Sequence, residues 1–330
     1  MKIILFQILL LFLLLATGCK STKVINDSYT LPMSKVTKSF RAIPATPVLV
    51  KIQQDTFIAP KGGHIQGIQQ LDRQHLVLSG SSTKKAYFFI ARMKGMARVK
   101  RRGTIIKMIY INDDFPEMRH NHASGFQLAN NLLAIGTEGG SDTIKSSIVF
   151  YDLTDPNTPK PLKTKINRQA DTAGAIGLIN LGNKMILAVG GWDSNRIDFY
   201  ETKTSFLQPL PLDFKLIKTW RTETKNTTDW NNRSWGSYQS LNFIKDEDDN
   251  LFLTGFHQNG NDDMIADLYQ VHLENDETTF LKKIDSRKLL TFEGASFKNG
   301  AGLSTLNAPR RLNLLATERN WNTEIRVNYW

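Results

Sequence analysis

A pattern of four short apolar runs recurs along this chain at intervals of roughly 60 residues, and it limits the possible folds more than any other feature. Each copy starts at a small residue within a polar stretch, and a second run such as MILAVG follows after a polar turn. A third run with paired aromatic residues, such as AYFFI, and a fourth run that carries lysine complete the copy. Four strand-length runs separated by turns are typical of a β-propeller blade. The small residues are Gly67, Gly125, Ala175, Ser240 and Gly302.

The last copy lacks its fourth run, because the third run, IRVNYW, ends at Trp330. A run of the missing type, PVLVKI, lies at residues 47–52, before the first copy. We therefore predict an all-β fold, a five-bladed β-propeller of four-stranded blades over residues 47–330, closed by the N-terminal strand pairing with the C-terminal blade. Closure of this kind leaves no edge strand unpaired.

Residues 1–18 have the pattern of a signal peptide, with an apolar run from Ile3 to Ala16 that is too short to span a membrane easily. Two small residues then precede Cys19, the only cysteine of the chain, and this segment resembles a bacterial lipoprotein signal. The resemblance implies cleavage before Cys19, a lipid on that residue, and a lipid-anchored protein of the bacterial cell envelope. Residues 19–46 are then the anchor and a polar tether. An ordinary cleaved signal or a short uncleaved anchor is the alternative.

Part of the net charge of +11 is concentrated beside the turn between the third and fourth runs of the first copy. Such a cluster attracts an acidic glycan, another envelope polymer or lipid headgroups, or it is a solvated turn with no partner. Nucleic acid is not an expected partner, because the cluster lacks the interleaved aromatic residues that stack on bases. The basic residues are Arg92, Lys94, Arg98, Lys100, Arg101 and Arg102.

One face of the predicted propeller is rich in His and Trp, because the loops that enter the first strand and those that join the second to the third share a face. Exposed Trp among carboxylates and imidazoles suits the binding of a sugar ring or a peptide. Alternatively, these Trp residues fasten long loops to the blades. The residues on this face include His64, His120, His122, Glu138, Trp192, Asp193, Trp230, Trp235, His257, Glu318, Arg319 and Trp321.

A polar residue stands three positions before each small residue, and in register these five side chains form a ring at the mouth of the central channel. The ring could hold an anion, a water cluster or a metal, or its members could satisfy one another. Imidazoles that titrate near pH 6.5 would bind an anion as cations. The ring residues are His64, His122, Thr172, Ser237 and Asn299.

His120 and His122 form an H-x-H pair, which ligates a metal only if the backbone there is extended. We do not predict a metal site on this evidence alone. The sequence also contains no nucleotide-binding loop, metal-protease helix or nucleophile elbow. It therefore assigns no catalytic residue and no cofactor.

Five-bladed propellers include arabinanase-like and invertase-like glycoside hydrolases, which this chain resembles in blade number only. The resemblance implies catalytic carboxylates on the innermost strands around the channel. Here Asp171 and Glu293 lie near the predicted mouth but out of register with the ring. Sugar-binding five-bladed lectins are similar in architecture, but their blades repeat almost identically, whereas these differ in every loop. One composite site is therefore expected rather than five equal ones.

The first hypothesis is a non-catalytic, lipid-anchored propeller that binds a glycan, a peptide or a partner protein on the face rich in His and Trp. The alternative is an envelope hydrolase or lyase at the mouth of the central channel. In that alternative His64, His122 or His257 works with Asp171 or Glu318 as acid and base.

Overall fold

The computed structural model describes residues 35–330 except 55, 95–101, 140–143, 204–211, 225–234, 306–310 and 322. The predicted signal peptide and Cys19 lie outside the described residues, as do Trp230 and part of the basic cluster, namely Arg98, Lys100 and Arg101. Within the described part of the chain, no helix is long and apolar enough to cross a membrane.

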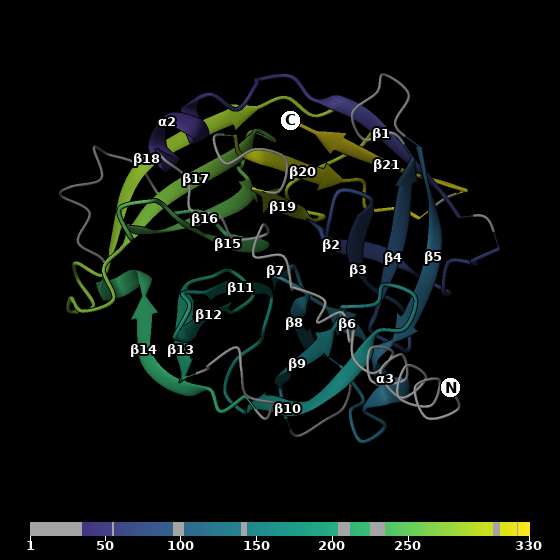
Figure 1. The fold of residues 1–330 in the computed structure, drawn as a ribbon, viewed down its shortest axis with the longest axis horizontal. Coiled ribbons are helices and arrows are strands. Elements are labelled where there is room, and N and C mark those ends of the chain that lie inside the picture. The colour runs from purple at the N-terminus through teal and green to yellow at the C-terminus, as the bar shows by residue number, and fades with distance from the viewer. Residues whose placement is uncertain are drawn as a thin grey trace, which may run out of the picture.

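The chain is all-β and forms a β-propeller, with its sheets arranged around a central axis (Figure 1). One sheet is continuous over eight strands in the order β19, β20, β21, β1, β5, β4, β3 and β2. Its strands in chain order are β1 (Val48–Gln53), β2 (His64–Gln70), β3 (His75–Ser81), β4 (Tyr87–Lys94), β5 (Arg102–Tyr110), β19 (Ala301–Ser304), β20 (Asn313–Thr317) and β21 (Glu324–Tyr329).

Three further sheets complete the arrangement. The second has the order β10, β9, β8 and β6, with β7 also paired to β8; the third runs from β11 to β14 and the fourth from β15 to β18. The second sheet comprises β6 (His122–Ala123), β7 (Gln127–Ala129), β8 (Leu132–Glu138), β9 (Ser146–Asp152) and β10 (Lys160–Arg168). The third comprises β11 (Ala175–Asn180), β12 (Lys184–Gly190), β13 (Arg196–Lys203) and β14 (Lys215–Arg221). The fourth comprises β15 (Ser240–Lys245), β16 (Leu251–Gln258), β17 (Met264–Val271) and β18 (Leu281–Leu289).

Burial differs between inner and outer strands in the way that the repeated runs predict. Every residue of β3 and β11 is buried, because sheets on both sides cover these strands. The outer strands β10 and β14 are largely exposed, which explains why the fourth runs carry lysine. Adjacent sheets meet through apolar faces; Phe88 of β4, for example, lies edge-on to Tyr151 of β9 with ring centroids 4.8 Å apart.

The short helices lie outside the sheets: α2 (Val36–Arg41), α3 (Ile111–Asp114) and the 3-10 helix η2 (Thr222–Thr224). Helix α2 falls within the predicted tether, yet Val36 and Phe40 are buried in a core cluster that also contains residues of β16 to β18. Arg287 of β18 donates a hydrogen bond to the carbonyl oxygen of Phe40 at 3.1 Å. The tether prediction is therefore corrected for this stretch, which packs against the fourth sheet because its apolar side chains recur at helical spacing.

Strand β1 pairs antiparallel with β21 over six residue pairs, from Val48 opposite Tyr329 to Gln53 opposite Glu324. It also pairs in parallel with β5, through Lys51–Gln53 and Arg102–Thr104. The strands of the first and last repeats therefore form one sheet, whereas the sequence pattern predicts separate blades. In Figure 1 this sheet runs from β19 near the axis to β21 and β1 at the edge, and back through β5 to β2.

Side-chain amides bridge the inner strands near the axis. The Gln127 Oε1 atom accepts hydrogen bonds from the backbone N–H groups of Leu178 at 3.0 Å and Phe243 at 2.7 Å, so β7 is tied to β11 and β15. The Asn242 Oδ1 atom accepts from Gln69 Nε2 at 3.0 Å and from the Leu303 N–H at 2.8 Å. These two amides therefore connect all five of the strands β2, β7, β11, β15 and β19.

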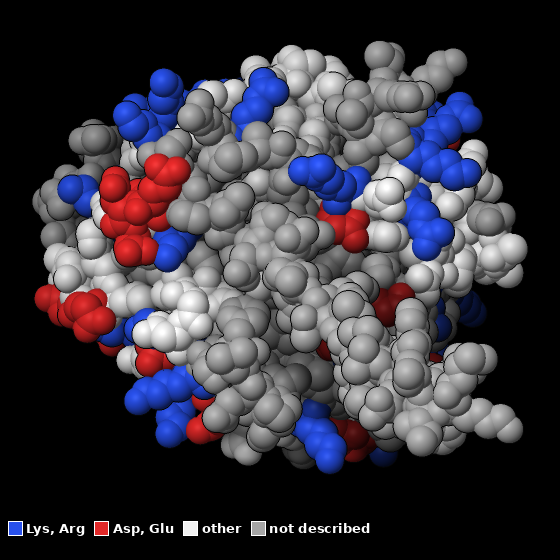
Figure 2. Space-filling model, viewed as in Figure 1, with Lys and Arg blue, Asp and Glu red and all other residues white. Residues whose placement is uncertain are grey.

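Steric crowding between the inner strands explains why each copy starts with a small residue. A Cβ at Gly125 would overlap the carbonyl oxygen of Gln239, and one at Gly302 would overlap that of Ile68, because the inner strands approach closely at the axis. A cavity of about 80 Å³ lies where these strands end, lined by Gln69, Gln127 and other residues of β2, β7, β11, β15 and β19. Figure 2 shows charged side chains spread around the rim, with acidic ones gathered over the fourth sheet.

Candidate functional site

Two histidines of the predicted ring lie side by side at the start of inner strands. His64 begins β2 and His122 begins β6, and their ring centroids are 6.0 Å apart with the planes tilted by 53°. The loop after β20 brings Arg319 to the same place, because the Arg319 carbonyl oxygen accepts a hydrogen bond from the N–H of Ile65 at 2.9 Å. The repeat register predicted that the two imidazoles are adjacent, and the structure places them so.

Glu138 lies next to His122 because the two residues are directly opposite in the antiparallel pairing of β6 and β8. The Oε1 atom of Glu138 is 3.5 Å from Nδ1 of His122, and the carboxyl side chain is only 5% exposed. The other oxygen, Oε2, accepts a hydrogen bond from the Ala173 N–H at 2.7 Å. No hydrogen-bond partner is described for His122 Nδ1, although this nitrogen is buried.

Burial moves the pKa values of this pair in opposite directions, toward the neutral forms. Desolvation raises the pKa of Glu138 above its usual value, and the charge of Asp171 adds to the increase. Desolvation, together with the charges of His64 and Arg319, lowers the pKa of His122 to about 4. Desolvation also lowers the pKa of His64. The expectation that both imidazoles titrate near pH 6.5 and bind an anion as cations is therefore corrected.

Trp192 provides an exposed aromatic surface beside this pair. Trp192 is 64% exposed. Its indole lies nearly parallel to the His122 ring, with ring centroids 6.3 Å apart and an angle of 16° between the planes. Thr172, another member of the predicted ring, accepts a hydrogen bond from the Trp192 backbone N–H through Oγ1 at 2.7 Å. Thr172 therefore helps to position the loop that carries the indole.

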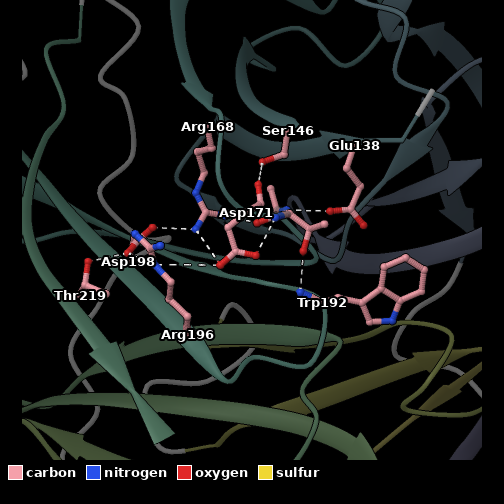
Figure 3. Close-up of polar contacts among 10 residues, drawn as sticks. Glu138, Ser146, Arg168, Asp171, Trp192, Arg196, Asp198 and Thr219 are labelled. Carbon is pink, nitrogen blue, oxygen red and sulfur yellow. Dashed lines mark hydrogen bonds and ion pairs between the residues drawn. The ribbon is translucent and has the colours of Figure 1, made fainter. Parts of the chain in front are cut away.

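An ionic network supports the other side of the same loop. Arg168 is buried and pairs with the buried carboxylate of Asp198 at 2.7 Å, while Arg196 pairs with Asp198 at 2.9 Å. The Asp171 carboxylate lies 3.7 Å from Arg168 and 4.0 Å from Arg196. In Figure 3 the Asp171 carboxylate points toward the two guanidinium groups, whereas Glu138 and Trp192 lie on the opposite side of the segment 171–173.

The sequence pattern singled out Asp171 but missed Arg168, Arg196 and Asp198. The only signal was the placement of Arg168 at the very end of a fourth run, directly before the loop that reaches the mouth. Arg196 and Asp198 begin a third run and alternate with apolar residues of β13, so their pattern was that of a half-buried strand.

Ser237 and Asn299, the remaining ring members, do not join the cluster around His122. Ser237 donates a hydrogen bond to the Asp193 carboxylate at 2.9 Å in an exposed position. Asn299 donates its backbone N–H to the carbonyl oxygen of Ser296 at 3.0 Å, and no side-chain contact of Asn299 is described.

Two further predicted site residues are buried within sheets. His257 packs edge-on against Tyr238 and places Nε2 3.4 Å from the buried carboxylate of Asp267. Trp321 is 7% exposed and stacks on Phe89 with centroids 4.7 Å apart. The staple interpretation therefore holds for Trp321, and His257 belongs to the interior of the fourth sheet.

Glu318 is also turned toward its own sheet. It accepts a hydrogen bond from the backbone N–H of Arg326 on β21 at 2.7 Å, and burial raises its pKa. His120 is buried with Nδ1 2.9 Å from Thr137 Oγ1 and Nε2 3.0 Å from the Ile144 carbonyl oxygen. Because both of its ring nitrogens lie within hydrogen-bond distance of protein oxygens, His120 does not act with His122 as a pair of metal ligands.

No family model matches this sequence, and no curated protein matches it. Solved structures similar in fold include an α-L-arabinanase from Penicillium chrysogenum in complex with arabinobiose (11% identity, 87% of this chain and 98% of that chain covered, TM-score 0.48). An endo-arabinase from Bacteroides thetaiotaomicron VPI-5482 (11% identity, 86% and 96% covered, TM-score 0.46) is another. An α-L-arabinofuranosidase from Podospora anserina in complex with cellotriose (8% identity, 87% and 98% covered, TM-score 0.43) is a third.

These comparisons correct the first functional hypothesis. All three solved structures are named as enzymes, either arabinanases or an arabinofuranosidase, and none of the three is named as a non-catalytic binding protein. The prediction of a non-catalytic binder is therefore corrected and is not carried forward. The likeness itself concerns the fold, since identity is low.

Proposed function

We propose that this protein is a hydrolase of carbohydrate substrates whose proton-transfer groups are Glu138 and His122. The observation that carries the proposal is a buried carboxyl group, with its pKa raised, 3.5 Å from an imidazole whose pKa is lowered to about 4. A site in which burial favours a protonated acid beside a neutral base is suited to general acid–base catalysis.

The chemistry of hydrolysis assigns each group a role. Glu138 donates its proton to the oxygen that leaves as the carbon–oxygen bond breaks. His122 accepts a proton from the water whose oxygen forms the new bond to that carbon. The imidazolium and the carboxylate that result are 3.5 Å apart, so the proton returns from His122 to Glu138 and both groups regain their starting states.

Trp192 supports a carbohydrate as the substrate. Its indole is largely exposed and lies parallel to the His122 ring, so a sugar ring stacked on it would be held beside the proton-transfer pair. The separation of Glu138 and His122 is shorter than the about 5–9 Å that separates the paired carboxylates of most glycoside hydrolases. The site therefore uses one compact acid–base pair rather than two carboxylates on opposite sides of the bond.

Replacing Glu138 with Gln tests the proposal. Glu138→Gln keeps the acceptor for the Ala173 N–H but cannot donate a carboxyl proton, so turnover should fall by about 10²–10⁴-fold. The measurement is release of reducing ends from a panel of neutral and acidic polysaccharides. Glu277→Gln, which changes an exposed carboxylate, is the matched control and should retain full activity.

The pH profile gives a second readout. Activity should rise as pH increases through about 4, where His122 becomes neutral. It should fall again as pH rises through the pKa of Glu138, which lies above the usual value of 4.5. A Glu138→Gln variant that is as active as the wild type, or a wild-type profile that is flat from pH 4 to 9, would contradict the assignment.

We also propose that the propeller has five blades and that β1 closes the ring. The order β19, β20, β21, β1 and the six pairs between β1 and β21 support closure, and the five inner strands joined by Gln127 and Asn242 support the blade count.

Export and lipid attachment at Cys19, with an envelope location, remain proposals that rest on the apolar run and the single cysteine. Under this proposal a Cys19→Ser variant should leave the membrane fraction, and its continued sedimentation with membranes would refute the anchor.

A further inference from the structure

Arg319 supplies a fixed positive charge at the mouth. The backbone hydrogen bond from Ile65 and the bridge between His64 and Asn320 hold this exposed residue against the first strand of the first repeat. Its charge adds to the desolvation that lowers the pKa values of His64 and His122. An arginine guanidinium carries its positive charge throughout the physiological pH range.

The other charges near the pair do not cancel it. Burial disfavours the charged form of Glu138 and so raises its pKa, and the carboxylate of Asp171 faces Arg168 and Arg196. Lys145 and Arg168 are the cations that act on Glu138. The His122 imidazole is neutral above about pH 4. Arg319 is therefore an exposed cation beside the proton-transfer pair, while the nearby carboxylate of Asp171 is already paired with other arginines.

We propose that Arg319 selects substrates in which a carboxylate is attached to the sugar next to the bond that is hydrolysed, as in glycans that contain uronic acids. This inference rests on the proposed function and specifies its substrate class. A guanidinium binds a carboxylate through two parallel hydrogen bonds in one plane. A sugar with a carboxylate should therefore bind more tightly than one with a hydroxymethyl group at the same position. A sugar ring on Trp192 would present its substituents within the same mouth, since Trp192, His122 and His64 follow one another at 6.3 Å and 6.0 Å.

The experiment compares acidic oligosaccharides with their methyl esters, which have the same shape but no charge. Binding of galacturonate, glucuronate and mannuronate oligosaccharides to the Glu138→Gln protein is measured by calorimetry. At least one acidic oligosaccharide should bind about tenfold more tightly than its methyl ester. Arg319→Gln on the same background should lose that preference and leave binding of the methyl ester unchanged.

Two control variants isolate the guanidinium. Arg73→Gln removes an exposed arginine from the turn between β2 and β3 and should retain the preference. Arg319→Lys retains the charge but loses the planar fork, and should retain only part of the preference. Affinity for the acid should not change between pH 5.5 and 7.5, whereas binding by imidazolium groups would weaken as pH rises over that range.

Equal binding of acids and methyl esters, an absence of binding to both, or an equal loss for both in Arg319→Gln would overturn the inference. Failure of the proposed function is a separate result. It appears as unchanged turnover in Glu138→Gln, whatever Arg319→Gln does to binding. A preference that disappears with Arg319 supports the inference even if the reaction is assigned differently.

Discussion

At the scale of single residues, histidines of similar sequence context have different surroundings. His120 has protein atoms near both ring nitrogens, and His257 lies 3.4 Å from the buried carboxylate of Asp267. His122 Nδ1, by contrast, lies 3.5 Å from the carboxyl group of Glu138 and has no hydrogen-bond partner among the described residues. The repeat register was enough to predict that His64 and His122 are neighbours. It could not predict their pKa values, because these depend on burial in the folded protein and on the charge of Arg319, which is far away in the sequence.

The lowered pKa of His122 predicts a loss of stability in acid. Between pH 6.5 and about 4 the unfolded chain binds a proton at this residue and the folded protein does not, so the free energy of unfolding decreases as pH falls through this window. A shift of this size corresponds to at most about 3 kcal/mol. His122→Gln should reduce the difference in stability between pH 7 and pH 4, measured by urea denaturation. His272→Gln, in the turn after β17, should behave as the wild type, and an equal pH dependence in both variants would argue against the buried neutral imidazole.

At the scale of elements, the repeated pattern predicted the strands well because each run is apolar, short and bounded by polar turns. In the sequence, Gln69, Gln127 and Asn242 each stand two positions after the small residue of their copy. What it could not show was the partners of these amides. Gln127 bonds to β15 as well as to its neighbour β11, and such contacts across the axis follow from the arrangement of strands in space.

The amide of Gln127 should therefore stabilise more than its own strand. Gln127→Leu would leave the N–H groups of Leu178 and Phe243 without their acceptor, and the Phe243 carbonyl oxygen would lose its donor. Unsatisfied buried backbone groups cost about 1–3 kcal/mol each, so we expect a loss of about 3 kcal/mol or more. Urea denaturation measures it, with the exposed Gln74→Leu as the matched control. A loss no greater than that of the control would show that the axial hydrogen bonds contribute little.

At the scale of the whole molecule, the position of β1 beside β21 followed from a simple count of runs. The count of runs did not predict that the first and last repeats merge into one sheet. The parallel pairing of β1 with β5 needs no sequence signal beyond two adjacent strands. The packing of α2 was missed for a related reason. Only Val36, Phe40 and Ile43 mark it as more than a polar linker, and their burial depends on a surface made by the fourth sheet and the last repeat.

A disulfide between the two ends of the propeller tests ring closure. Lys51 and Arg326 are opposite one another in the register of β1 and β21, so Lys51→Cys with Arg326→Cys on a Cys19→Ser background should form a bond on oxidation. The bond closes a very long loop and should stabilise the fold by about 2–4 kcal/mol. Lys51→Cys with Asn328→Cys is out of register and should form the bond poorly. Mobility on non-reducing gels reports both, and efficient bonding of the second pair but not the first would show a different register.

The amide bridges at the axis also govern how molecules move through the protein. Gln127 and Asn242 join inner strands across the axis, so their side chains lie in the path along it, beside a cavity of about 80 Å³. If Glu138 and His122 hydrolyse a glycan as proposed, the released fragments would leave by the opening through which the next chain arrives. Under that proposal, a fragment that stays on the exposed Trp192 would compete directly with fresh polymer for the same opening.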